Sequence, residues 1–372
     1  MFAKYLPNGD LLFIINNMKK MNYYNEQKIK TTDRLREILS DFPDFAIDFF
    51  TGIENRTSAL TRINYAYDLR TFFNWAKRET DILDDRKRMF DIEVEDLERF
   101  NTTDFERYMS YLTSYVDENG QIQTNGPQGK ARKIAAVRSF FKYYFRREMI
   151  SVDLASKIQT PKLHEKPIIR LEDDEVNTFL NVVESGTGLM GHEKGFHKHT
   201  KARDIAIITL MLGTGIRVSE CVGLNVSDID FSNNSIVVTR KGGSQTILYF
   251  SNEVKTALLD WIALRNLKDL KNEEALFISL QNKRICTRAV EKLVKKYAGI
   301  VTPLKHITPH KLRSTYGTKL YHATQDIYMV ADVLGHKDVN TTKKHYAAIT
   351  DDIRKKASTA VVLRQNQNED EE

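Results

Sequence analysis

The sequence predicts a mainly α-helical fold with a small β-sheet (α+β), with a helical first half and a mixed second half. Three observations predict this class. Apolar residues recur at helical spacing through most of the first half, from Ser58 onward. Two β-branched runs, residues 235–240 and 245–250, flank the sequence Lys-Gly-Gly-Ser and indicate a hairpin. Residues 159–167 hold two prolines among polar neighbours, which is typical of a linker.

The composition excludes several classes of protein. The chain has 372 residues, which is enough for two or three domains, and a formal net charge of +6, which favours an anionic partner. Its two cysteines are too few for a disulfide framework, so we expect a reducing, cytoplasmic location. No apolar run reaches the roughly 18 residues that a membrane-spanning helix needs.

The chain divides into segments of different character. Residues 1–50 form an N-terminal extension with no clear assignment, and residues 51–160 form the helical domain. The linker covers residues 161–168, and the second domain covers residues 169–364. The polar and acidic residues 365–372 are expected to be a disordered tail.

Helices account for the first domain. A long amphipathic helix follows Ser58, a second runs from Asp104 to Tyr115, and a third runs from about Lys130 to Arg147. Asn119-Gly120 breaks the chain before the third helix.

The second domain is mixed. Acidic residues at 172–175 suit the first turn of a helix, and residues 202–212 form an apolar helix. The hairpin follows, and Ser251 then caps a helix that runs through Leu264. Helices dominate the remainder.

The third helix of the first domain is a candidate DNA-binding surface. Seven Lys or Arg residues and no acidic residue fall between residues 130 and 147. A solvated face usually mixes both signs of charge, whereas phosphate contacts require one. The candidate DNA contacts are Lys130, Arg132, Lys133, Arg138 and Lys142.

Two short segments of the second domain carry basic side chains next to turn signals. Arg217 follows two glycines that permit a tight turn, and Glu220 lies one helical step further on, where it can orient the guanidinium. By itself, such a pair is more typical of a surface ion pair, which contributes little. Thr308 and Pro309 then suit the N-cap and the first turn of another helix.

The helix that starts at Thr308 carries His310 and Arg313 one turn apart on a shared face. A helix N-terminus favours an anion, so these two side chains form a plausible phosphate clamp. Further on, Gly335 is a helix stop followed by His336, and Tyr346 lies on the next helix. Tyrosine can serve as a covalent nucleophile, although most tyrosines are packing residues.

A histidine cluster offers a competing interpretation. His192, Glu193, His197 and His199 lie close together, which is compatible with a metal site. The segment is polar and rich in glycine, so we interpret it as an exposed loop and expect no metal.

Arg217 with Glu220, Lys241 in a hairpin, His310-x-x-Arg313, Leu334-Gly335-His336 and Tyr346 together resemble the tyrosine recombinases, or phage integrase family. Residues 334–346 are especially similar to the Xer-type branch and to integrases of bacterial mobile elements. The resemblance extends from Ser58 to Arg364 and is weaker in the first half.

The resemblance implies a fold and a mechanism. A helical core-binding domain would clamp DNA, and a mixed α/β domain would cut it. Tyr346 would attack the scissile phosphate and form a 3′-phosphotyrosyl link, while Arg217 and Arg313 hold the non-bridging oxygens. Lys241 would protonate the leaving 5′-oxygen, His310 would assist proton transfer, and His336 would hydrogen-bond the phosphate.

The resemblance also implies partners. The substrate would be double-stranded DNA at a specific site, and a homo-tetramer would act on two sites through a Holliday junction. No cofactor is implied, because the phosphotyrosine keeps the bond energy and the arginines supply positive charge. The alternatives are a type IB topoisomerase-like or hairpin-forming strand transferase and a catalytically inert DNA-binding regulator.

Overall fold

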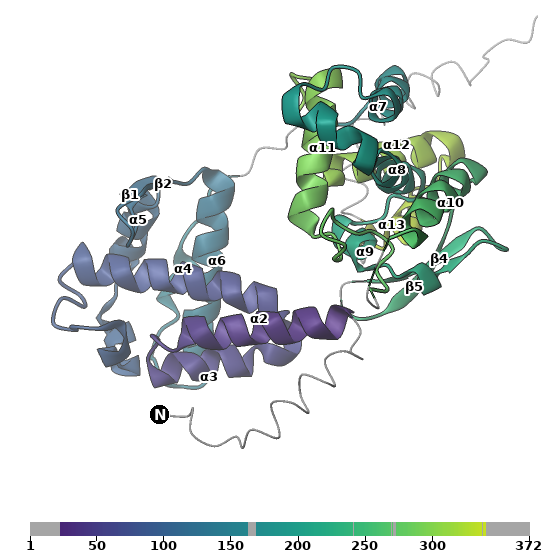
Figure 1. Ribbon diagram of the computed structural model, residues 1–372. Coiled ribbons are helices and arrows are strands. Elements are labelled where there is room, and N and C mark those ends of the chain that lie inside the picture. Colours follow the sequence, from purple (N-terminus) through teal and green to yellow (C-terminus); the bar gives the residue numbers. More distant parts are fainter. Residues whose placement is uncertain are drawn as a thin grey trace, which may run out of the picture. The chain divides into compact units, whose positions relative to one another are not determined.

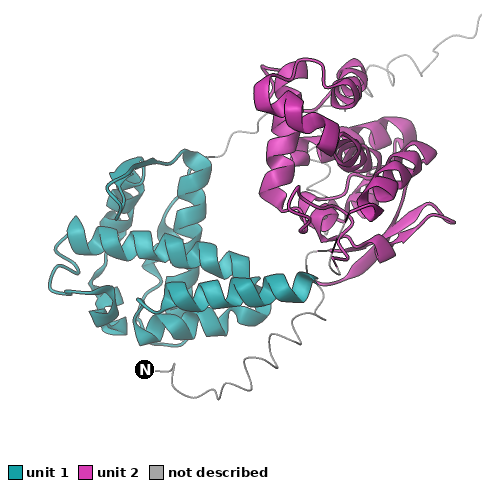
Figure 2. Ribbon diagram, in the orientation of Figure 1, with its two compact units in different colours: residues 1–165 teal, residues 166–372 magenta. Residues whose placement is uncertain are grey.

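The computed structural model describes residues 23–162, 169–240, 242–268, 270, 273–336 and 338–339. The chain divides into two compact units, residues 1–165 and residues 166–372, which are coloured separately in Figure 2. In the part of the chain so described, no helix is both long enough and apolar enough to cross a membrane.

Helices dominate the first unit (Figure 1). The longer ones are α2 (Tyr23–Leu39), α3 (Asp44–Gly52), α4 (Ala59–Arg78), α5 (Thr102–Tyr111) and α6 (Pro127–Phe145). Short 3₁₀ turns cover Glu54–Arg56, Met89–Asp91, Val94–Arg99 and Leu154–Lys157.

Local capping chemistry sets where these helices begin. The Ser58 hydroxyl accepts a hydrogen bond from the Thr61 amide at 3.2 Å and starts α4. Asn101 caps α5 in the same way, through the Thr103 amide at 2.9 Å. Pro127 occupies the first turn of α6, so this helix starts three residues before its predicted position at Lys130.

The core of the first unit is aromatic, and residues before position 51 contribute to it. Phe49 of α3 contacts Phe140 of α6 with ring centroids 5.1 Å apart. Leu35 and Ile38 of α2 are buried in the same core, and α2 packs along α4. The predicted boundary at residue 51 therefore falls inside α3, and the described part of the extension belongs to the first unit.

A small hairpin in the first unit was not predicted. Strands β1 (Ser114–Val116) and β2 (Ile122–Thr124) pair antiparallel, and Val116 lies opposite Ile122. The predicted helix 104–115 therefore ends early, at Tyr111. Gly120 lies in the turn with φ of 74°, a conformation that glycine adopts without strain.

The second unit combines helices with one small sheet (Figure 1). Its helices are α7 (Asp173–Ser185), α8 (Gly191–Thr214), α9 (Val218–Gly223), α10 (Asn252–Asn266), α11 (Thr287–Val301), α12 (Pro309–Thr324) and α13 (Ile327–Leu334). A 3₁₀ turn covers Val226–Asp228, and the strands are β3 (Ile229–Asp230), β4 (Ser235–Thr239) and β5 (Gln245–Tyr249). Helix α8 packs against α7, α10 and α12.

The sheet is antiparallel in the order β3-β4-β5, and its main element is the predicted hairpin of β4 and β5. Ser235 lies opposite Tyr249 and Thr239 lies opposite Gln245. Ile236 and Val238 are buried while Val237 between them is exposed, so one face of the sheet covers the core.

The histidine segment is helical, so its interpretation as an exposed loop was wrong. Residues 192–199 lie in the first half of α8. His197 is buried, and its Nε2 lies 2.8 Å from the Val183 carbonyl oxygen of α7. Among the described residues, no three His, Cys, Asp or Glu side chains gather as metal ligands.

Candidate active site

Arg217 and Glu220 form a reciprocal pair at the start of α9. Arg217 is the N-cap residue, and its backbone amide donates to Glu220 Oε2 at 3.0 Å. Its Nη1 donates to Glu220 Oε1 at 2.7 Å. Glu220 is only 2% exposed, whereas the Arg217 side chain is 32% exposed. The buried carboxylate therefore holds a guanidinium that still reaches solvent.

The turn before Arg217 depends on Gly215. This glycine ends α8 with φ of 63°, and an added Cβ would lie 2.4 Å from Tyr316 Cδ1. Any other residue there would be strained and would collide with α12. The glycine therefore brings the start of α9 close to α12.

Arg313 lies deep in the unit, although His310 on the same helix is exposed. Thr308 is the N-cap residue of α12 and Pro309 opens the helix, as predicted. Arg313 is 4% exposed, and its Nη1 donates to the Gly215 carbonyl oxygen at 2.6 Å. Its Nη2 donates to the Leu334 carbonyl oxygen.

The C-terminus of α13 supplies further acceptors. Gly335 ends this helix with φ of 61°, and the amide of His336 donates to the Ala331 carbonyl oxygen at 2.9 Å. The Gly335 carbonyl oxygen accepts from Arg217 Nη2 at 3.0 Å. His336 is half-buried and directly follows these carbonyls in the chain.

A third guanidinium, Arg240, reaches the same helix end. Its Nη2 donates to the Val333 carbonyl oxygen at 2.8 Å, and its Nη1 donates to that of Leu334 at 3.2 Å. Nη1 also lies 3.5 Å from Glu220 Oε2. Burial lowers the pKa of Arg240, and the neighbouring Glu220 opposes this shift. Sequence reasoning missed this residue, because no local signal distinguishes it from other basic residues.

Three guanidiniums from three different elements thus converge on the last carbonyls of α13. Arg217 is the N-cap residue of α9, Arg313 lies on α12, and Arg240 directly follows β4. A helix C-terminus carries partial negative charge, so it favours cations. These bonds hold the three guanidiniums close to one another at one end of the helix.

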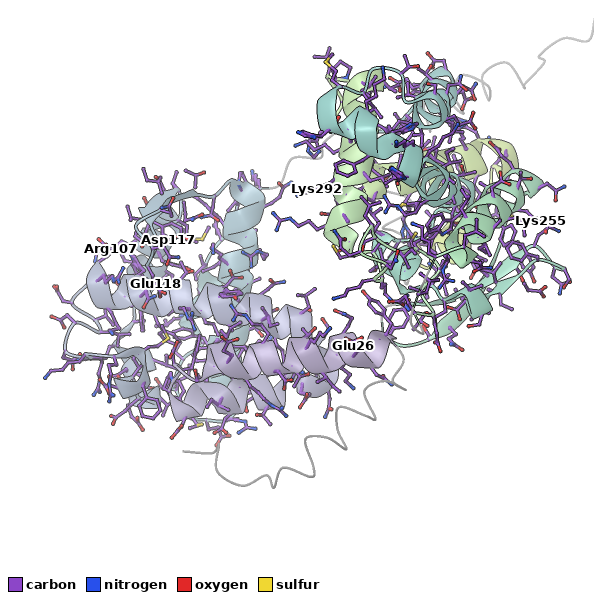
Figure 3. All side chains as sticks on the ribbon, in the orientation of Figure 1. Glu26, Arg107, Asp117, Glu118, Lys255 and Lys292 are labelled. Atoms are coloured by element: carbon purple, nitrogen blue, oxygen red, sulfur yellow. The ribbon has the colours of Figure 1, made fainter. Side chains whose placement is uncertain are left out.

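A basic recess lies beside the arginines. It has a volume of about 470 Å³ and lies where α11 meets the start of α12. Figure 3 shows Lys292 extending outward from α11. Glu291 is the acidic residue among the lining, and the basic or titratable members are Arg288, Lys292, Lys295, His306 and His310. An anionic group suits this surface.

Two of the six predicted catalytic residues, Lys241 and Tyr346, lie outside the described residues. The structure brings Arg217, Arg313 and the chain preceding His336 together at the end of α13, with Glu220 beneath them. His310 lines the recess instead.

The predicted DNA contacts on α6 have different environments. Lys133 is 7% exposed, and its ammonium lies 3.3 Å from Asp68 Oδ1. Arg132 also pairs with Asp68, which is fully buried. As placed, Lys133 stabilises the core of the first unit and is not available to a phosphate. Burial raises the pKa of Asp68, while the two cations oppose this shift.

The remaining basic residues of α6 are more accessible. Lys142 is exposed, and Lys130 is half-buried with its ammonium 2.6 Å from Thr113 Oγ1. Arg138 is half-buried and donates from Nε to the Ala155 carbonyl oxygen at 3.1 Å. Of the five candidates, Lys142 and Arg132 are the exposed ones.

Comparisons with known proteins identify the family. The model of the phage integrase family matches residues 170–352. The chain is 31% identical over 320 residues to tyrosine recombinase XerC of Caldanaerobacter subterraneus subsp. tengcongensis, over 82% of this chain and 81% of that protein. It is 29% identical over 355 residues to tyrosine recombinase XerS of Streptococcus thermophilus, over 87% of this chain and 97% of that protein.

A solved structure shares the fold. XerH site-specific recombinase, bound to palindromic difH substrate in a post-cleavage complex, matches with a TM-score of 0.62 and 19% identity, over 81% of this chain and 80% of that chain. This likeness confirms the predicted mainly α fold with a small sheet. The XerC relative covers most of both proteins at 31% identity. This chain therefore belongs to the tyrosine recombinases of the phage integrase family.

Proposed function

We propose that this protein is a site-specific DNA recombinase that cleaves and rejoins strands through a 3′-phosphotyrosyl intermediate. One observation supports this most strongly. Arg217 and Arg313, from helices nearly a hundred residues apart, are both held by the carbonyls at the end of α13. Two preset guanidiniums suit the two non-bridging oxygens of a phosphodiester.

Each residue of the proposed site has a distinct role. Tyr346 attacks the phosphorus and displaces the 5′-oxygen, which Lys241 protonates. Arg217 and Arg313 stabilise the charge on the pentacoordinate transition state, and Glu220 orients Arg217. His310 moves a proton near the nucleophile, and His336 donates a hydrogen bond to the phosphate. Attack by the 5′-hydroxyl of a second strand reverses the step and rejoins the DNA.

The two units suit a division of labour. We assign the first unit, from residue 23 onward, as the DNA-clamping core-binding domain, and residues 169–364 as the catalytic domain. The solved structure of XerH site-specific recombinase, which shares this fold, is bound to a palindromic difH substrate. The basic recess beside α11 offers phosphate contacts next to His310. We further propose a homo-tetramer acting on two duplex sites through a Holliday junction in the cytoplasm, without a cofactor.

Cleavage in the presence of a chelator tests this proposal. A nicked duplex carrying the target site should form a covalent protein–DNA adduct in excess EDTA, because the arginines supply the positive charge that a metal would otherwise provide. The adduct is measured on a denaturing gel. Loss of the adduct in EDTA, with recovery in magnesium, would contradict the metal-free mechanism. Exchange of strands between two duplexes, with no relaxation of a single plasmid, separates a recombinase from a topoisomerase.

Neutralising two accessible cations of α6 should weaken DNA binding on every sequence. Lys142→Gln with Lys130→Gln removes two cations and leaves the buried Lys133–Asp68 pair intact. The slope of log affinity against log salt concentration should fall by about one unit for each lost phosphate contact. Binding titrations at several salt concentrations measure the slope. Lys157→Gln, on the turn after α6, is the control. An unchanged slope in the double variant would mean that this face of α6 is solvated and does not contact phosphate.

A further inference from the structure

Arg240 is the last described residue before Lys241, and the resemblance assigns it no role. Its side chain is 10% exposed and lies against Glu220 and the end of α13. The two carbonyl bonds, to Val333 and Leu334, span 93 and 94 residues of sequence. Closing the hairpin does not require these side-chain bonds to a distant helix, so they need a separate explanation.

The backbone of Arg240 belongs to the hairpin. Its amide donates to the Ser244 carbonyl oxygen at 2.7 Å, and its carbonyl oxygen accepts from the Gly243 amide at 3.0 Å. The backbone therefore closes the turn between β4 and β5, while the side chain reaches α13. One residue joins the hairpin to the helix end that also holds Arg217 and Arg313.

The contact between Arg240 and α13 is close. A Cβ added to Gly335 would lie 2.9 Å from Arg240 Cζ, so the guanidinium packs directly on the glycine backbone. A guanidinium presents several donors in a rigid plane, and here it uses them on two carbonyls and a carboxylate. A single ammonium or amide group cannot make this set of bonds.

We propose that Arg240 is a positioning residue for Lys241. Arg240 holds the hairpin at a fixed distance from the end of α13, whose carbonyls also hold Arg217 and Arg313. Lys241 is the next residue of this hairpin. Because consecutive Cα atoms are about 3.8 Å apart across a trans peptide, fixing Arg240 restricts where Lys241 can act. This inference rests on the proposed function, in which Lys241 protonates the leaving 5′-oxygen.

The test uses two versions of a nicked duplex, with oxygen or sulfur at the 5′ bridging position of the scissile phosphate. A thiolate leaves without protonation, so the proton donor becomes dispensable. Arg240→Gln should cleave the oxygen substrate about tenfold to a hundredfold more slowly, a part of what a positioned proton donor contributes. On the sulfur substrate it should cleave within about threefold of the unaltered chain, as Lys241→Ala should. Combining both substitutions should cost no more than Lys241→Ala alone.

A second buried arginine provides a matched control. Arg265 of α10 is 5% exposed and donates to the Ala275 and Glu273 carbonyl oxygens at 2.8 and 2.6 Å. Arg265→Gln loses bonds of the same kind away from the arginine cluster. It should lower the melting temperature as Arg240→Gln does and cleave both substrates at the normal rate. If Arg240→Gln melts below the assay temperature, Arg240→Lys replaces it in the test. This variant should also cleave the oxygen substrate slowly and the sulfur substrate at nearly the normal rate.

The outcomes separate this inference from the proposed function. Equal defects of the Arg240 variants on oxygen and sulfur, or a double variant much slower than Lys241→Ala, would overturn the positioning role. In either case the unaltered chain still forms its adduct and the proposed function stands. If the unaltered chain forms no adduct with either substrate, the proposed function fails and this inference fails with it.

Discussion

Tyr346→Phe is expected to bind duplex DNA as tightly as the unaltered chain and to form no covalent adduct. Phenylalanine keeps the aromatic ring and removes only the oxygen that bonds to phosphorus. Because the intermediate cannot form without this oxygen, the loss should be complete rather than graded. Binding is measured by mobility shift, and the adduct is measured on a denaturing gel of a nicked duplex.

Tyr328→Phe on α13 is the matched control, because Tyr328 is 71% exposed and lies before His336 in the same part of the chain. It should bind and cleave normally. An adduct that persists in Tyr346→Phe would place the nucleophile on another residue. An adduct that disappears in both variants would mean that general damage, and not the missing hydroxyl, explains the loss.

Glu220→Gln is expected to destabilise the second unit and to slow cleavage. The buried carboxylate accepts from Arg217 and lies beside Arg240, and a neutral amide leaves both guanidiniums uncompensated. Breaking a buried ion pair costs roughly 3–5 kcal/mol. We expect the lower end of this range, because the Arg217 side chain is 32% exposed. Misplacing Arg217 by about 1 Å should slow cleavage by about 10²-fold.

Glu175→Gln separates this effect from the loss of an accessible ion pair at the start of a helix. Glu175 occupies the same capping position in α7, accepting from the Glu172 amide at 2.8 Å and from Lys305 Nζ at 2.6 Å. Glutamine can still accept the amide hydrogen bond, so the substitution mainly weakens the ion pair with Lys305. It should cost about 1 kcal/mol or less and leave cleavage unchanged. Urea unfolding and single-turnover cleavage measure the two effects. Equal losses in both variants would refute a special role for Glu220.

Elements with strong local signals could be predicted from the sequence. Thr308-Pro309 starts α12 and Gly335 ends α13, because capping depends on a few neighbouring residues. The hairpin of β4 and β5 followed from two β-branched runs around a glycine turn. Hairpin β1–β2 escaped prediction, because its strands have three residues each and β2 is fully exposed, so no alternation marks them.

Partners that lie far away in the sequence could not be predicted. Lys133 looks like any basic residue of its helix, but its counterion Asp68 lies 65 positions earlier. Helix α3 joins the aromatic core through Phe140 of α6, and α2 joins it by packing along α4, so neither contact is visible in the local sequence. The identity of the candidate catalytic residues came from their order along the chain, whereas the common anchor of Arg217, Arg240 and Arg313 required coordinates.

The end of α13 has a consequence for how the protein folds. This helix has eight residues, fewer than the roughly 12–15 that an isolated helix needs to persist in water. Its buried side chains Val330 and Leu334 form a small cluster with α12, and its terminal carbonyls are satisfied by guanidiniums. The residues proposed to bind phosphate thus also complete the secondary structure beneath them. Natural selection for catalysis and selection for a folded chain therefore act on the same arginines. Few substitutions of these arginines could change catalysis without also changing stability.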